Sequence, residues 1–244
     1  MLKDQQDAYG HGLLDHLSGK PAAEIVQRDD GYFNANHGFG GYFTEYRDWP
    51  PHCKRAMKHV RGQVLDIGCG AGRHSLYLQE AGFDVLGIDN SPLAIKVCKQ
   101  RGLKKARVLS ITQVTSKLGR FDTILMLGNN FGLFGSFQRA RWLLRRFKGV
   151  TSENARIIAE SNDPYMTEDP EHLAYHRRSR RRGRMGGQIR MQVRYRVYAT
   201  PWFDYLLVSK DEMKAILAGT GWAVRRFLDS EGSAYVAVIE KECA

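Results

Sequence analysis

The stretch Val64-Leu65-Asp66-Ile67-Gly68-Cys69-Gly70-Ala71-Gly72 decides the fold of this 244-residue chain. An apolar run with β-branched members ends in three alternating glycines, and residues 73–81 follow with helical character. Glycines at such a strand-to-helix turn let a ligand approach the backbone closely, and the helix start offers it unpaired N–H groups. A second apolar run, residues 83–88, ends in Asp89, whose carboxylate could take both hydroxyls of a ribose. The pattern predicts a nucleotide-type site at the carboxyl ends of adjacent parallel strands.

The spacing of the glycines discriminates between nucleotides. The dinucleotide fingerprint G-x-G-x-x-G would place its third glycine where the chain has Arg73. Asp66 precedes the first glycine, and its charge would repel a pyrophosphate but attract the ammonium group of an amino acid. The pattern Asp66-x-Gly68-x-Gly70-x-Gly72 resembles motif I of class I S-adenosylmethionine (SAM) methyltransferases, and Gly87-Ile88-Asp89-Asn90-Ser91 resembles their second motif.

This resemblance implies a set of cofactor-binding residues. The glycines would shape the loop under the methionine and ribose portions of SAM, and Asp89 would take the ribose hydroxyls. The third strand ends at Ser110, where the superfamily usually has an acid, so backbone groups at Ser110 and Ile111, or alternatively Gln113, are expected to read the adenine. The predicted cofactor residues are Asp66, Gly68, Cys69, Gly70, Gly72, Asp89, Asn90, Ser110, Ile111, Gly128, Asn129 and Tyr42. The product would be S-adenosylhomocysteine (SAH), and no metal is expected.

Composition agrees with a single globular enzyme. Apolar residues make up 43% of the chain, enough for one large core, and no apolar run reaches about 18 residues. The first residues lack the apolar stretch of a secretory signal, and the four cysteines form no C-x-x-C pair. We therefore expect a cytoplasmic protein with reduced cysteines, no membrane association, and a monomeric or homodimeric state.

From residue 63 onward, strand-like and helix-like segments alternate, which favours a parallel sheet with crossover helices. The predicted fold is α/β: a Rossmann-like, seven-stranded, mostly parallel sheet with flanking helices, an N-terminal helical lid and a β-hairpin insertion. We expect a lid segment at 1–60 and a methyltransferase domain at 61–244 with the insertion at about 166–208. The expected strands are 63–67, 84–88, 106–109, 121–127, 155–160, 222–228 and 234–239, and the expected helices are 73–81, 91–101, 136–148 and 209–218.

The first 60 residues do not continue this alternation. Residues 22–29 have helical spacing after Pro21, and residues 53–59 are expected to form a second helix. In the small-molecule methyltransferases that this chain resembles, such a segment folds over the cofactor. An aromatic ring facing a sulfonium is favoured electrostatically, so Tyr42 and Tyr32 are candidates. His37 is a candidate base, although a structural histidine is the alternative.

The fourth strand runs into Gly128-Asn129-Asn130-Phe131-Gly132, similar to the Gly-Asn-Ser/Asn-Phe of glycine-type N-methyltransferases. It is not the Asn-Pro-Pro-Tyr signature of enzymes that methylate nucleobase amines. By that similarity Asn130 would orient the acceptor, whereas a plain β-turn would favour the same residue types. Asp163 is a further candidate on the acceptor side, as a binding residue. His172, Tyr175 and His176 lie at helical spacing, and one of them could accept a proton from the acceptor; a surface helix with ordinary histidines is the alternative.

Residues 177–196 contain nine arginines and no acid. Since the formal net charge of the chain is +11, removing these nine leaves only +2, and the basicity is local. Residues 188–198 alternate strictly and predict a strand, with residues 200–208 as its antiparallel partner. Arginine faces recognise carboxylate or phosphate groups, so Arg190, Arg194 and Trp202 are predicted to contact the acceptor. A solvated or dimer-facing arginine surface is the alternative.

These patterns predict a SAM-dependent methyltransferase that acts on a small molecule, acidic or amine-bearing. The first alternative is a ribosomal or transfer RNA methyltransferase that places the arginine-rich hairpin on phosphates. The second is a non-catalytic SAM-binding partner protein, and the glycine spacing disfavours a Rossmann dehydrogenase.

Overall fold

The computed structural model describes residues 2–242, apart from the side chains of Asn36 and His37. The chain forms two compact units, each assembled from three segments. The first unit comprises Met1–Trp49, Leu65–Gln113 and Arg190–Phe203, and the second comprises Pro50–Val64, Val114–Ile189 and Asp204–Ala244. The expected division into a lid at 1–60 and a domain at 61–244 stays a prediction.

Seven strands form the main sheet. They are β3 (Val64–Ile67), β4 (Val85–Asp89), β5 (Ala106–Val108), β6 (Phe121–Met126), β7 (Thr151–Asn162), β11 (Trp222–Asp229) and β12 (Ala234–Lys241). Their order is β11-β12-β7-β6-β3-β4-β5. In the first unit β4 runs parallel to β5, and in the second β6 runs parallel to β7 while β12 is antiparallel to both β7 and β11. The predicted Rossmann-like, mostly parallel sheet with an antiparallel end is therefore confirmed.

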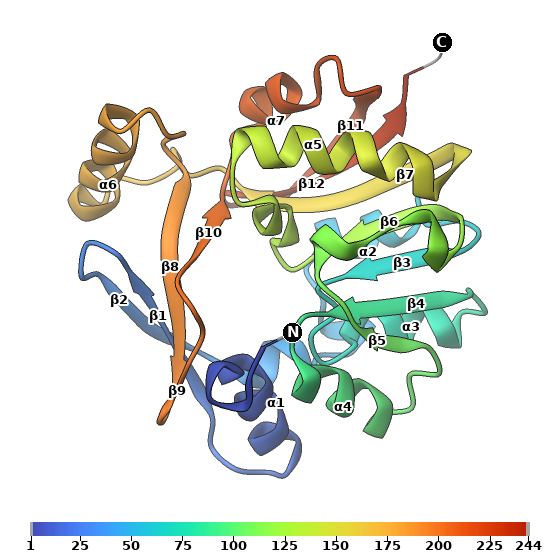
Figure 1. Ribbon diagram of the computed structural model, residues 1–244, viewed down its shortest axis with the longest axis horizontal. Coiled ribbons are helices and arrows are strands. Elements are labelled where there is room, and N and C mark those ends of the chain that lie inside the picture. The colour runs from blue at the N-terminus through green and yellow to red at the C-terminus, as the bar shows by residue number, and fades with distance from the viewer. Residues whose placement is uncertain (1, 243–244) are drawn as a thin grey trace. The chain divides into compact units, whose positions relative to one another are not determined.

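Helices begin where the sequence offers caps. They are α1 (Ala8–Leu17), α2 (Pro51–Met57), α3 (Arg73–Glu80), α4 (Pro92–Gln100), α5 (Phe137–Phe147), α6 (Pro170–Arg181) and α7 (Lys210–Leu217). The hydroxyl of Ser91 accepts the Ala94 N–H at the start of α4, and Ser209 and Glu212 form a capping box on α7. In the second unit α5 and α7 lie side by side next to β11 (Figure 1). The helices expected at 73–81, 91–101, 136–148 and 209–218 are confirmed within two residues.

The helix expected at residues 22–29 is wrong, because this segment is a strand. A second sheet holds β1 (Ala23–Arg28), β2 (Phe33–Gly38), β8 (Gln188–Tyr195), β9 (Tyr198–Ala199) and β10 (Phe203–Leu206) in the order β10-β8-β1-β2, with β9 pairing β8. β1 is antiparallel to both β2 and β8. The β-branched Ile25 and Val26 suit a strand, and pairing on both sides outweighs the weak helical spacing. The predicted hairpin around residues 188–208 is confirmed, and β1 extends it into a larger sheet.

The sequence analysis predicts no helix where the structure has α1. Gly10 and Gly12 lower its helix propensity, but they let it pack closely. A Cβ on Gly10 would collide with Leu93 at the start of α4, and a Cβ on Gly12 would collide with the ring of Phe39. Figure 1 shows α1 beside α4 within the first unit. Close helix packing therefore decides a segment that propensity disfavours.

Buried thiols fill the core behind the glycine turn. Cys69, Ile95, Cys98, Leu103 and Ala106 form one apolar cluster, with the sulfur atoms of Cys69 and Cys98 3.8 Å apart. Both cysteines are free, and their thiols fill this cluster as small apolar groups. A contact of Cys69 with the cofactor stays a prediction. Within residues 2–242, no helix is long and apolar enough to cross a membrane.

Candidate cofactor and acceptor sites

Three glycines make the turn between β3 and α3. Their φ angles are +75° at Gly68, +55° at Gly70 and +81° at Gly72, in the left-handed region that other residues adopt only with strain. Gly72 is the residue that caps the start of α3, so the turn delivers the chain into a helix N-terminus. The backbone is thus shaped for the close approach of a ligand, as the spacing of the glycines predicts.

Asp89, at the end of β4, holds this turn in place. Its Oδ2 accepts the N–H of Gly70 at 3.0 Å, and its Oδ1 accepts the N–H of Ser91 at 2.9 Å. Burial raises the pKa of Asp89 above its usual value, and backbone hydrogen bonds from Ser91, Gly70 and Asn90 work against that rise. A carboxylate has about four acceptor positions, so acceptor capacity remains for a ribose hydroxyl. The neighbouring Asn90 is exposed.

Asp66 is buried inside the first unit. Its side chain is 2% exposed, and its Oδ2 accepts a hydrogen bond of 2.6 Å from the hydroxyl of Ser75 on α3. Burial raises the pKa of Asp66 to about 6. The observed contact fastens α3 to β3, and direct cofactor binding by Asp66 stays a prediction.

Tyr42 contacts the glycine turn. Its ring lies 3.5 Å from the position that a Cβ on Gly70 would take, so a larger residue at position 70 would meet it. Its hydroxyl donates to the carboxylate of Glu24 on β1, at 3.4 Å from each oxygen. Glu24 is 7% exposed, and burial raises the pKa of Glu24 to about 7. The sequence analysis missed Glu24 because it predicts a helix for residues 22–29. In a strand, alternate side chains face inward, and that pattern points Glu24 into the protein.

A short 3-10 turn, Ile111–Gln113, follows strand β5. Ile111 is buried, and the backbone N–H of Ser110 donates to the side chain of Gln113 at 3.0 Å. Adenine recognition by Ser110 and Ile111 stays a prediction.

In the second unit, Gly128 and Asn129 form the turn that follows β6. Both have positive φ angles, +72° and +68°, which asparagine tolerates better than most residues. The Asn129 carbonyl accepts a hydrogen bond of 2.6 Å from the hydroxyl of Tyr205, and its side-chain Oδ1 is buried without a hydrogen-bond partner. A buried amide oxygen without a partner is costly unless a ligand donates to it. Asn130 begins the 3-10 helix Asn130–Phe134 and is half-buried.

Glu160 anchors the same turn from β7. Its Oε2 accepts the N–H of Gly128 at 2.6 Å and that of Asn129 at 3.4 Å, while its Oε1 lies 3.4 Å from Nε2 of His52. Burial works to raise the pKa of Glu160, but the hydrogen bonds from His52 and Gly128 outweigh it and hold the pKa below its usual value. Sequence reasoning missed Glu160 and His52, since 107 residues separate them in the chain and no motif joins them.

Cys53 completes a cluster around this carboxylate. Its sulfur lies 4.0 Å from Oε2 of Glu160, and His52, Cys53 and Glu160 offer three ligand atoms within 4.8 Å of one another. These donor types suit zinc. The Glu160 oxygens already accept two backbone N–H groups and face His52, so the contacts seen here are those of an anchor for the turn.

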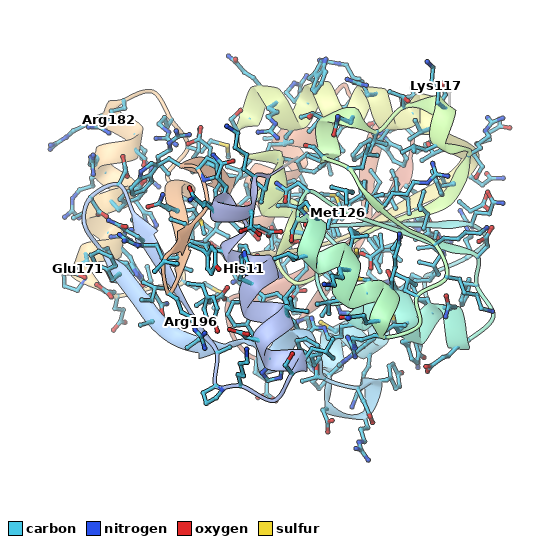
Figure 2. The ribbon with its side chains drawn as sticks, turned by 60° about the horizontal axis from the view of Figure 1, so that its bottom comes forward. His11, Lys117, Met126, Glu171, Arg182 and Arg196 are labelled. Carbon is cyan, nitrogen blue, oxygen red and sulfur yellow. The ribbon has the colours of Figure 1, made fainter. Side chains whose placement is uncertain are left out.

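The predicted proton acceptors of the second unit lie on α6. Tyr175 and His176 are buried on one side of the helix, and the ring of Tyr165 packs edge-on against His176. His172 is half-buried, with Nδ1 3.3 Å from the hydroxyl of Thr167. Figure 2 shows Glu171 and Arg182 at opposite ends of α6, and in Figure 1 α6 lies clear of α5 and α7. A catalytic role for these residues stays a prediction.

The predicted acceptor-binding residues occupy varied surroundings. Arg194 is exposed and pairs in register with Ile25, on the face opposite the buried Val193. Arg190 is half-buried, Trp202 is 37% exposed, and the ring of Tyr32 stacks under the guanidinium of Arg28 at 4.2 Å.

The backbone of His37 pairs with Glu24, but the side chain of His37 lies outside the described part. Oδ1 of Asp163 accepts the N–H of Tyr165 at 2.9 Å. Acceptor contact by these residues stays a prediction.

Comparison with known proteins agrees with this geometry. Residues 64–153 match a family model described as a methyltransferase domain. The glycine/sarcosine N-methyltransferase of Halorhodospira halochloris is 28% identical over 152 residues, 55% of this chain and 57% of that protein. The enzyme of the same name from Aphanothece halophytica is 31% identical over 116 residues, 45% of this chain and 44% of that protein. The chain thus spans about half the length of these curated relatives.

One solved structure matches along the whole chain. It is a SAM-dependent methyltransferase from Bacteroides fragilis in complex with SAH, 25% identical, with a TM-score of 0.84 over 100% of this chain and 98% of that one. The family model, the fold and the glycine turn agree with one another. The chain therefore carries a methyltransferase domain of the class I, SAM-dependent type.

Proposed function

We propose that this protein transfers a methyl group from SAM to an amine nitrogen of a small molecule and releases SAH. The observation that carries the proposal is the glycine turn at 68–72, held on the carboxylate of Asp89. Bound SAM supplies an electrophilic methyl group on a positively charged sulfur. The similarity to a methyltransferase that binds SAH supports this cofactor.

The residues of the first unit fit the parts of SAM. Gly68 and Gly70 have no side chains, so the backbone is uncovered where the methionine and ribose portions would lie. Glycine also tolerates the positive φ angles that this turn requires. Asp89 has acceptor capacity left for a ribose hydroxyl. The ring of Tyr42 lies against the turn, where its π face could oppose a sulfonium.

The amine acceptor is proposed from the relatives and from the second unit. Two curated relatives carry the name glycine/sarcosine N-methyltransferase. The turn at Gly128–Asn130 resembles the Gly-Asn-Ser/Asn-Phe of glycine-type N-methyltransferases. The partnerless Oδ1 of Asn129 is an acceptor suited to an N–H donor. Methyl transfer of this type needs alignment above all, and positioning can supply about 7–11 kcal/mol.

The experiment is a titration of the purified protein with SAM and SAH, with NAD as the control, followed by transfer of labelled methyl from SAM to glycine and sarcosine. Micromolar binding of SAM and SAH with labelled product is the expected result. Binding of NAD, or binding of SAH with no transfer to either amine, would contradict the cofactor or the acceptor part of the proposal respectively.

A further inference from the structure

The carboxylate of Glu24 is buried in the first unit, and no cation among the described side chains pairs with it. It is 7% exposed, and the hydroxyl of Tyr42 donates to it at a distance of 3.4 Å. Among the described side chains, no lysine or arginine forms an ion pair with it. Burying a carboxylate without a positive partner is expensive, so such a group either becomes neutral through a raised pKa or is stabilised by a cation. A cationic ligand can supply that partner.

The other charge on the same face of β1 is already neutralised. Glu24, Val26 and Arg28 alternate along the strand and share one face. The guanidinium of Arg28 makes two hydrogen bonds, 2.8 and 3.0 Å long, to the carboxylate of Asp30. Among the described side chains, Glu24 is therefore the charge on this face of β1 that has no ion-pair partner.

Tyr42 connects this carboxylate with the cofactor turn. Its hydroxyl contacts Glu24, and its ring lies against the Cβ position of Gly70. Tyr42 therefore links Glu24 to the glycine turn that would hold SAM. It also belongs to β1, outside the matched domain at 64–153, in a part of the chain free to be specific for the acceptor.

We propose that Glu24 is a catalytic residue that binds the ammonium group of the methyl acceptor and takes its proton. This inference rests on the proposed function and deepens it, because it defines the acceptor as a primary or secondary amine that arrives as a cation. Tyr42 positions the carboxylate through its hydrogen bond.

The proposed step balances in protons and electrons. The ammonium form of the acceptor has no lone pair, so one proton passes from its nitrogen to a Glu24 oxygen. The freed lone pair forms the new N–C bond while the C–S bond breaks, and its electron pair stays on sulfur. The positive charge moves from sulfur to the methylated nitrogen, and Glu24 returns its proton to water after the product leaves. With the pKa of Glu24 raised to about 7 by burial, the carboxylate is ionised in slightly alkaline solution and attracts the proton well.

The α-ammonium of SAM has the same chemistry as an acceptor ammonium, and the test separates the two. The variant Glu24→Gln keeps the shape of the side chain and a hydrogen-bond partner for Tyr42, but removes the charge. Glu45→Gln, an exposed glutamate of the same unit with only a surface pair to Arg47, is the matched control. Affinity for SAH is measured by calorimetry, and kcat/KM for glycine and sarcosine is measured with labelled SAM.

We expect Glu24→Gln to lower kcat/KM for the better amine at least 100-fold, with the SAH affinity within twofold of the wild type. The control should match the wild type in both measurements. If the glutamine variant does not fold, as judged by circular dichroism, Glu24→Asp is measured instead. Aspartate keeps the negative charge but moves it away from the acceptor, so kcat/KM for the better amine should fall at least tenfold.

Three results would overturn the inference. One is a kcat/KM that changes less than threefold, and another is a parallel loss of SAH affinity, which would assign Glu24 to the ammonium of SAM. The third is a wild-type protein that binds SAH but methylates neither amine. A wild-type protein that fails to bind SAH would instead refute the proposed function itself.

Discussion

Removing the buried charge of Glu24 should stabilise the protein, and by an amount that depends on pH. The pKa of this carboxyl is about 7 in the folded protein and 4.5 in its ordinary state, since burial penalises the charged form. The difference of about 2.5 units corresponds to about 3 kcal/mol of folding free energy. Below pH 4.5 the group is neutral in both states and costs nothing. As pH rises towards 7, the unfolded chain ionises first, and the folded state loses stability relative to it.

Glu24→Gln abolishes this loss because glutamine does not titrate. The difference in unfolding free energy between variant and wild type should therefore grow by about 3 kcal/mol between pH 4.5 and pH 7.5 and stay level above that. Urea unfolding of both proteins at intervals of one pH unit measures it, and other carboxyls that titrate in this range, such as Asp66, cancel in the comparison. A difference that is constant with pH would show that Glu24 is not desolvated in the folded protein, and would refute the reasoning.

Four further outcomes are expected. Asp89→Ala should weaken SAH binding at least tenfold by calorimetry, because it removes the ribose acceptor and frees the Gly70 N–H; unchanged affinity would contradict that role. Glu160→Gln should lower kcat about tenfold or more and leave SAH affinity intact, because one acceptor oxygen cannot serve both His52 and the Gly128 turn; Glu153→Gln, exposed on the same strand, is its control, and equal effects of the two would refute the anchor. The double variant Arg190→Ala with Arg194→Ala should raise the acceptor KM without changing SAH affinity. A loss of SAH affinity would contradict an acceptor-binding role for these two arginines. The wild-type protein should bind RNA weakly or not at all at 150 mM salt, whereas tight binding that falls steeply with salt would favour an RNA substrate.

Local pattern sufficed for much of the fold. The apolar runs at 64–67 and 85–89, the glycine turn and the serine caps of α4 and α7 are all short-range signals, and the structure follows them. The hydrogen bond between Asp89 and the Gly70 N–H is a finding of the structure that the sequence analysis does not predict.

Tertiary pairing decided the rest. Residues 23–28 form a strand because β2 and β8 flank them, which spacing along the sequence cannot show. Gly10 lies in a helix because Leu93 packs where its side chain would be. Glu24 and Glu160 stand out only once their surroundings are known. Glu24 is buried with no cation among the described side chains beside it, and Glu160 accepts two backbone N–H groups of a turn distant in sequence.

The most direct test of the central claim is calorimetric titration of SAH into the purified protein, with Asp89→Ala beside it. The account predicts micromolar binding with one site per chain, and at least a tenfold loss in the variant. A folded wild-type protein that binds neither SAH nor SAM would contradict the assignment of the glycine turn as a cofactor site.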